Sequence, residues 1–228
     1  MTCFKQTLLT FVCLATFTPG LPGETTVYRD DFDGSEHLPL NGQAPDVRPG
    51  REVWSVFERM ARNPTDPRAD GTFPGGARRT ANLPVELEPG NVYTFTANLR
   101  IANPDRDSED FGGISINETP TTGTHLQSDI AFLAIRRNGG AQATTAGEAR
   151  TIDIPAGTYA VDRSEGQELA IAIDTSDEDW TVMYEIDGDV VGRRDLPSRD
   201  LGTYYLNIGQ YDSANVVFEF IALVRSRS

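Results

Sequence analysis

Hydrophobic and polar residues alternate along much of this chain with the two-residue period of β-strands. The clearest run, "VYTFTANLRI" at 92–101, alternates aromatic and aliphatic residues with threonine, asparagine and arginine. Such a strand buries one face and exposes the other, as strands of antiparallel sheets do. Similar runs, separated by clusters of Gly, Pro, Asn and Asp, occur at 25–32, 51–58, 78–87, 111–116, 129–137, 167–175, 179–186, 189–195, 203–211 and 215–225.

Two segments depart from simple alternation. The run at 129–137 is apolar on both faces, which predicts an interior strand, and "NGG" at 138–140 predicts the turn after it. The segment 141–165 contains the strand-like "ARTIDIPAG" between loop-like flanks. No window has the periodicity of a long amphipathic helix. The pattern therefore predicts one all-β domain, a two-sheet antiparallel β-sandwich.

The first 23 residues have the composition of a secretory signal peptide. Lys5 precedes an apolar run over 7–17, which small and turn-forming residues follow. The run is too short for a stable transmembrane helix. We expect the domain to comprise 24–228 and to be secreted, to the extracellular space or the periplasm. It would contain neither thiol nor disulfide, since Cys3 and Cys13 lie in the signal.

The chain is strongly acidic, with 34 Asp and Glu residues against 20 Lys and Arg and a net charge of −14. Such a surface repels nucleic acid and anionic lipid. We expect neither as a partner, no insertion into membranes, and a monomeric protein. Lys5 is the only lysine. An acidic composition without further lysine suits a saline habitat, where salt screens self-repulsion, and a GC-rich genome would equally favour arginine over lysine.

The segment "DWTVMYEIDGDVVG" at 179–192 has two interpretations. On one continuous strand, Glu185, Asp187 and Asp189 would share a face, and retaining glycosidases use two carboxyl groups about 5–5.5 Å apart. However, Asp187-Gly188 is also a preferred type I′ hairpin turn, which would place Asp189 on the next strand. We favour the hairpin and assign no catalytic residue.

Several motifs together resemble one family. "DDFDG" at 30–34, "LNGQAPDV" at 40–47, the following Trp54, W-x-V-x-Y-x-x-DG-x-x-V at 180–191 and "VVFEFIAL" at 216–223 are similar to LamG-like, concanavalin A-like jelly-roll domains of secreted bacterial proteins. The resemblance implies two antiparallel sheets, adjacent first and last strands, and a concave face or loop rim available for glycans. The superfamily includes lectins, carbohydrate-binding modules, glucanases and polysaccharide lyases, so the fold alone does not choose an activity.

Five residues at solvent-facing strand positions are candidate glycan ligands: Asn98 and Arg100 on 92–101, Glu185 on 179–186, and Tyr205 and Asn207 on 203–211. If these strands share a sheet, the side chains line its outer face. A ring there can stack on a sugar while amides and arginine bond its hydroxyls. Trp54 and Trp180 are instead predicted to lie in the core.

Two groups of acidic residues are candidate ligands of a structural calcium ion. The loop "NPDRDSED" at 103–110 includes Asp105 and Asp107, and Asp31 and Glu219 belong to the first and last strands. Calcium prefers such oxygen ligands. The alternative interpretation of both groups is that their carboxylates are solvated or simply terminate strands.

The leading hypothesis is a secreted, non-catalytic, lectin-like carbohydrate-binding module. The alternatives are an extracellular protein-interaction or matrix domain and, third, a polysaccharide-degrading hydrolase or lyase. His37 and His125 lie in polar loop sequence and are predicted to be solvated rather than to act as catalytic bases.

Overall fold

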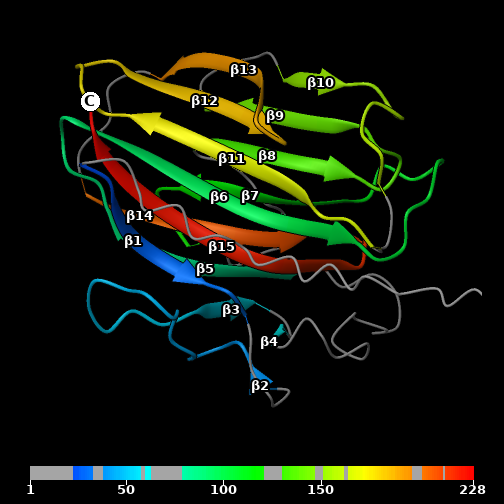
Figure 1. The fold of residues 1–228 in the computed structure, drawn as a ribbon, viewed down its shortest axis with the longest axis horizontal. Coiled ribbons are helices and arrows are strands. Elements are labelled where there is room, and N and C mark those ends of the chain that lie inside the picture. Colours follow the sequence, from blue (N-terminus) through cyan, green and yellow to red (C-terminus); the bar gives the residue numbers. More distant parts are fainter. Residues whose placement is uncertain are drawn as a thin grey trace, which may run out of the picture.

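The computed structural model describes residues 23–32, 38–57, 60–62, 79–120, 130–146, 151–161, 164–196, 202–212 and 214–228. Within these ranges the chain contains no helix and forms two antiparallel sheets packed face to face, as Figure 1 shows. The predicted all-β sandwich is confirmed. The predicted signal peptide, His37 and His125 lie outside the described residues. No helix long and apolar enough to cross a membrane occurs in the described part of the chain.

The first sheet has six strands and includes both ends of the domain. The first and last strands are neighbours, as the resemblance implies, with Thr25 opposite Arg225 and Asp30 opposite Ile221. In spatial order the strands are β1 (Thr25–Asp30), β15 (Val216–Arg227), β6 (Asn91–Ile101), β11 (Gln167–Asp174), β12 (Trp180–Ile186) and β13 (Asp189–Leu196).

The second sheet has seven strands and lies behind the first in Figure 1. Its order is β10 (Ile152–Ile154), β9 (Ala141–Thr145), β8 (Ala131–Arg136), β7 (Phe111–Asn117), β14 (Thr203–Gln210), β5 (Arg79–Glu86) and β3 (Ser55–Phe57). β8 is an interior strand, as predicted, and β9 and β10 occupy the segment that the alternation did not resolve. A separate two-stranded ribbon pairs β2 (Leu38–Pro39) with β4 (Ala61–Arg62).

The hydrophobic core lies between the two sheets, where alternate side chains of each strand point inward. Tyr184 of β12 reaches across this core to β9. Its hydroxyl donates a hydrogen bond to the Thr144 carbonyl at 2.7 Å and lies 2.7 Å from the Thr145 hydroxyl. The buried phenol is therefore fully paired, which avoids the cost of an unsatisfied polar group in the core.

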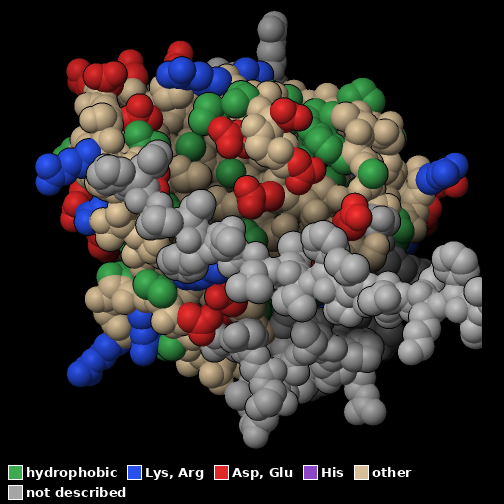
Figure 2. Space-filling view, viewed as in Figure 1, with side chains coloured by type: hydrophobic (Ala, Val, Ile, Leu, Met, Phe, Trp, Pro, Cys, Tyr) green, Lys and Arg blue, Asp and Glu red, His purple; other side chains and the backbone are tan. Residues whose placement is uncertain are grey.

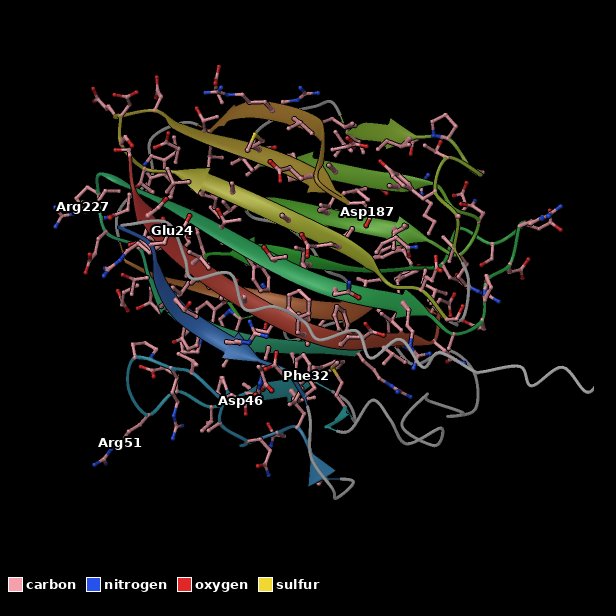
Figure 3. The ribbon with its side chains drawn as sticks, in the orientation of Figure 1. Glu24, Phe32, Asp46, Arg51, Asp187 and Arg227 are labelled. Atoms are coloured by element: carbon pink, nitrogen blue, oxygen red, sulfur yellow. The ribbon has the colours of Figure 1, made fainter. Side chains whose placement is uncertain are left out.

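A buried contact attaches the segment after β1 to the sandwich. The Trp54 indole donates a hydrogen bond to Asp30 Oδ2 at 2.8 Å, and the Phe32 amide donates to Asp30 Oδ1 at 2.9 Å. The Phe32 and Trp54 rings pack 5.8 Å apart, and Figure 3 shows Phe32 near the end of β1. Trp54 and Trp180 are both buried, which confirms their prediction as core residues.

β12 and β13 form the hairpin predicted at 187–188. Asp187 and Gly188 have φ values of 53° and 81°, which are the two positive φ angles of a type I′ turn. Asp189 pairs with Ile186 as the first residue of β13. Glu185 and Asp189 are consequently on different strands, and the one-strand interpretation of the acidic motif is wrong.

Candidate functional site

The five predicted ligand residues lie on two different sheets. Asn98, Arg100 and Glu185 belong to β6 and β12 of the six-stranded sheet, whereas Tyr205 and Asn207 belong to β14 of the seven-stranded sheet. The core separates the two outer faces. The condition under which all five would line one surface, that their strands share a sheet, is therefore not met, because local alternation does not determine which strands pair.

The three residues on the six-stranded sheet do not form a cluster. β11 separates β6 from β12, and Arg100 is engaged with Glu219, with Nε 3.4 Å from Oε1. Asn98 Oδ1 is buried without a hydrogen-bond partner among the described residues. Figure 2 shows that Asp and Glu side chains are scattered over the middle of this face, with arginines mainly toward its edges.

The outer face of the seven-stranded sheet has a row of buried polar side chains. Because Ile114 and Ile116 of β7 point into the core, Ser115 between them points outward. The strand register places Ser115 opposite Asn207 of β14, and Asn207 opposite Asn82 of β5. These three residues, here called the polar floor, are only 0–3% exposed.

The polar floor has unused hydrogen-bonding capacity. Asn207 Nδ2 donates to the Tyr205 carbonyl at 3.0 Å and to the Ser115 carbonyl at 3.4 Å. Among the described residues, nothing bonds Asn207 Oδ1 or Ser115 Oγ. A buried polar atom without a partner costs about 1–3 kcal/mol. Both oxygens would gain from a partner, and because they are buried, a ligand hydroxyl reaches them only where the covering side chains move aside.

An aromatic cluster of Phe111, Phe132 and Tyr211 adjoins the polar floor. The rings of Phe111 and Tyr211 are stacked, with centroids 5.1 Å apart and planes 8° apart. Phe132 meets Phe111 edge-on at 5.6 Å and is opposite Ser115 in the register of β8 with β7. Phe111 and Tyr211 are half-exposed, so the stacked pair offers ring surface to a ligand.

The charges at the β9–β10 side of this face are compensated. Arg136 of β8 lies 2.7 Å from Asp153 of β10 and donates a hydrogen bond to Gln142 Oε1 of β9 at 3.2 Å. The floor itself is neutral. This face therefore carries the partly exposed Phe111–Tyr211 rings beside a buried floor of amides and a hydroxyl, and β8, β9 and β10 have no unpaired charge.

Sequence reasoning missed most of this face. It predicted the strand at 111–116 but did not use its alternation, which places Phe111, Gly113 and Ser115 on one side. Gly113 was a further signal, because a glycine inside a strand indicates a close backbone approach. In the structure a Cβ there would lie 2.4 Å from the Leu133 carbonyl oxygen of β8. The sequence did not show that Phe132 points outward, because the strand at 129–137 is apolar on both faces.

The candidate calcium ligands of the 103–110 loop are held by an arginine. Arg137 lies 3.2 Å from Asp110 and 3.5 Å from Asp105, and it also donates to the Asn103 carbonyl at 2.8 Å. Asp107 is exposed and contributes its amide to Asp105 Oδ1 at 3.1 Å. The guanidinium of Arg137 thus occupies the position in which a cation would neutralise this loop.

Asp31 and Glu219 are likewise paired with different arginines. Asp31 lies 2.8 Å from Arg29, and its amide donates to Asp46 Oδ2 at 2.9 Å; Glu219 pairs with Arg100. Within the described ranges, no group of three His, Cys, Asp or Glu side chains has the arrangement of a metal site. The four candidate residues therefore do not fit a calcium ion.

No family model and no curated protein sequence matches the chain. Solved structures do match it. An endo-1,3-β-glucanase from Streptomyces sioyaensis is similar with a TM-score of 0.56 and 12% identity, over 93% of this chain and 100% of that chain. The carbohydrate recognition domain of Emp47p is similar with a TM-score of 0.54 and 11% identity, over 92% and 100%.

The potassium-bound carbohydrate recognition domain of Emp46p gives a TM-score of 0.52 and 10% identity, over 76% of this chain and 88% of that chain. At these identities the likeness concerns the fold. This chain is a concanavalin A-like jelly roll, a class of fold found in carbohydrate recognition domains and in a glucanase. The choice between binding and catalysis depends on the site.

Proposed function

We propose that this protein is a secreted, non-catalytic carbohydrate-binding module that holds a glycan on the outer face of its seven-stranded sheet. The observation that carries the proposal is the contact between the aromatic cluster and the polar floor on that face. Tyr205 and Asn207, predicted as ligands from the sequence, both belong to this sheet, whereas Asn98, Arg100 and Glu185 are not part of the proposed site.

The two parts of the face suit the two surfaces of a sugar. The half-exposed Phe111–Tyr211 pair offers a flat apolar surface for the C–H face of a pyranose ring. Hydroxyl groups at the ring edge are both donors and acceptors, and Ser115 Oγ and Asn207 Oδ1 lack partners. A small number of fixed polar groups beside an apolar surface is the usual composition of a saccharide site.

The charge of the central strands supports binding rather than hydrolysis. Glycoside hydrolysis ordinarily requires two carboxyl groups that flank the scissile bond. β5, β7, β8 and β14 together contain one carboxylate, Glu86, which hydrogen-bonds Thr203 at the strand end. The outward positions of β7 carry Phe111, Gly113, Ser115 and Asn117 instead.

A glycan-array screen of residues 24–228, with and without calcium, tests the proposal. We expect a specific glycan to bind equally well in both conditions. Tyr211→Ala removes the stacked ring and should weaken binding about tenfold. Tyr211→Phe keeps the ring and is the matched control, so it should retain binding.

Three results would overturn the proposal. A blank array together with capture of a purified extracellular protein would favour the interaction domain. Release of reducing ends or unsaturated sugars from the bound glycan would favour the hydrolase or lyase. Loss of binding on Glu185→Gln but not on Tyr211→Ala would move the site to the six-stranded sheet.

A further inference from the structure

A hollow lies at one end of the sandwich, among the loops after β6, β8 and β10. These loops are at the right-hand end of Figure 1. It has a volume of about 670 Å³, and its lining includes Asp105, Arg106, Arg137, Asn138 and Tyr159. We call it the loop pocket. Hollows of this size are large enough to bury a small ligand.

The backbone of the loop pocket is tightly fixed. The Gly157 amide donates to the Asn138 carbonyl at 2.8 Å, and the Tyr159 amide donates to the Gly139 carbonyl at 2.9 Å. Gly139 has a φ of 78°, and a Cβ there would lie 2.3 Å from the Tyr159 carbonyl oxygen. Only glycine allows this approach of the two loops. The pocket wall is therefore preorganised, which lowers the entropy cost of binding.

Three side-chain donors that line the loop pocket are unpaired within the described part of the chain. Asn138 uses its Oδ1 to accept the Gly140 amide at 2.9 Å, which leaves Nδ2 free. The Arg106 guanidinium and the Tyr159 hydroxyl make no hydrogen bond there either. Burial, together with nearby Asp187 and Asp189, raises the pKa of Tyr159, so its hydroxyl remains a neutral donor.

The carboxylate of Asp105, which also lines the loop pocket, is by contrast occupied. Asp105 Oδ1 accepts the Asp107 amide at 3.1 Å, and Oδ2 lies 3.5 Å from Arg137. Arg137 is shared by the carboxylates of Asp105 and Asp110, and Asp187 and Asp189 lie near Tyr159, whereas Arg106 makes no ion pair with a described residue. The free donors, with the unpaired guanidinium of Arg106 among them, favour a ligand group that accepts charge-assisted hydrogen bonds, such as a carboxylate.

We propose that the loop pocket binds a single uronic acid residue, through its ring carboxylate. Arg106 and Asn138 donate to the carboxylate, and the Tyr159 hydroxyl donates to a ring oxygen. Val161, Ala156 and Pro104 provide the apolar wall for the ring. This site is separate from the outer face of the seven-stranded sheet, and the inference does not depend on the function proposed for that face.

Calorimetric titration of residues 24–228 with three small probes tests the inference. Glucuronate carries both ring and carboxylate, glucose carries the ring alone, and acetate carries the carboxylate alone. We expect glucuronate to bind at least about tenfold more tightly than either, since a charge-assisted hydrogen bond contributes this much. Its affinity should fall as NaCl is raised, because the arginine is exposed.

Matched variants locate the site. Arg106→Gln should weaken glucuronate binding about tenfold. The matched control is Arg227→Gln, in β15 opposite Asn91 at the far end of β6 (Figure 3), which should not alter glucuronate binding. Asn138→Asp keeps the oxygen that accepts the Gly140 amide but replaces the free donor with a carboxylate, so it should abolish binding. Tyr211→Ala should leave glucuronate binding intact, which separates this site from the sheet face.

Three outcomes would overturn the inference. Equal binding of glucose and glucuronate would show that the carboxylate is not recognised, and equal binding of acetate would show that the ring is not. An Arg106→Gln variant that binds glucuronate as well as the parent protein would place the binding elsewhere.

Discussion

At the scale of single residues, the indole of Trp54 has a role that a hydrophobic residue cannot replace. It donates to Asp30, which is 0% exposed. Trp54→Phe leaves Asp30 Oδ2 without this donor, and we expect the free energy of unfolding to fall by about 2–3 kcal/mol. Urea denaturation measures the change.

The control for this substitution is Trp180→Phe. Trp180 is buried as well, at 4% exposure, but it makes no hydrogen bond with the described residues. Trp180→Phe should therefore lower the free energy of unfolding less than Trp54→Phe does, because only packing is lost. Equal losses for the two variants would show that ring volume, rather than the Asp30 hydrogen bond, sets the stability.

Tyr28 gives the protein a predictable alkaline limit. Burial, reinforced by Glu52 and Glu86, raises the pKa of its phenol well above 10. Its hydroxyl donates to the Pro84 carbonyl at 2.6 Å. In the unfolded chain the phenol ionises near pH 10. The contribution of Tyr28 to stability is therefore complete below about pH 10 and is lost as the pH rises toward the folded-state pKa.

Tyr28→Phe should flatten this alkaline loss of stability, at the cost of the Pro84 hydrogen bond near neutral pH. Urea unfolding measured at intervals from about pH 8 to 11 checks both effects. Tyr205→Phe, at a half-exposed site of β14, controls for the loss of one phenol. If the free energy of unfolding falls with pH equally steeply for Tyr28→Phe and the parent protein above about pH 10, the prediction is contradicted.

At the scale of strands, sequence alternation predicted most elements because each strand buries one face against the core. β6 is the clearest example, with side chains from Tyr93 to Ile101 alternately buried and half-exposed. β9 was not separated from the loop-like flank, since "AQATT" is short and weakly hydrophobic, whereas β10 lies within the strand-like "ARTIDIPAG". The Asp187-Gly188 turn was predictable because the positive φ angles of a type I′ turn require such residues.

The close approach of β7 and β8 leads to a prediction about Gly113. A Cβ at this position would lie 2.4 Å from the Leu133 carbonyl oxygen and 2.8 Å from the Ala134 Cα. Both are backbone atoms of a paired strand, so Gly113→Ala must displace β8. We expect a loss of about 2–3 kcal/mol in the free energy of unfolding, with a change in near-ultraviolet circular dichroism from the neighbouring aromatic cluster.

Gly202→Ala is the matched control for Gly113→Ala. Gly202 precedes β14, and a Cβ there meets nothing within 4 Å. The change should alter the free energy of unfolding by less than about 0.5 kcal/mol. A Gly113→Ala variant as stable as the control would mean that β8 can shift without cost, and the neighbouring aromatic cluster would then also be adaptable.

At the scale of the whole molecule, the sequence could not show which strands belong to which sheet. The residues at 92–101, 179–186 and 203–211 have similar alternation, but β14 pairs with β5 and β7, whereas β6 and β12 both pair with β11. Strand pairing depends on contacts between segments far apart in the chain. The fold was therefore predictable from local pattern, while the site, which needs the pairing, was not.

The net charge of −14 should make stability depend on salt throughout the molecule. Like charges on a compact domain repel one another, and unfolding relieves this repulsion. The Debye length falls from about 30 Å at 0.01 M salt to about 3 Å at 1 M. We expect Tm to rise over this range in NaCl and KCl alike, because screening depends on ionic strength.

Calcium chloride at matched ionic strength separates screening from a specific site. The carboxylates of Asp31, Asp105 and Glu219 are already paired with arginines, so calcium should raise Tm no more than NaCl does. Scanning calorimetry across both salts measures this difference. An additional rise in Tm at millimolar calcium would mean that the ion displaces an arginine from one of these pairs. If the loop at 103–110 holds the ion, Arg137→Gln should then increase the rise in Tm that calcium causes. A flat or falling Tm in NaCl would show instead that the ion pairs of the folded state outweigh its self-repulsion.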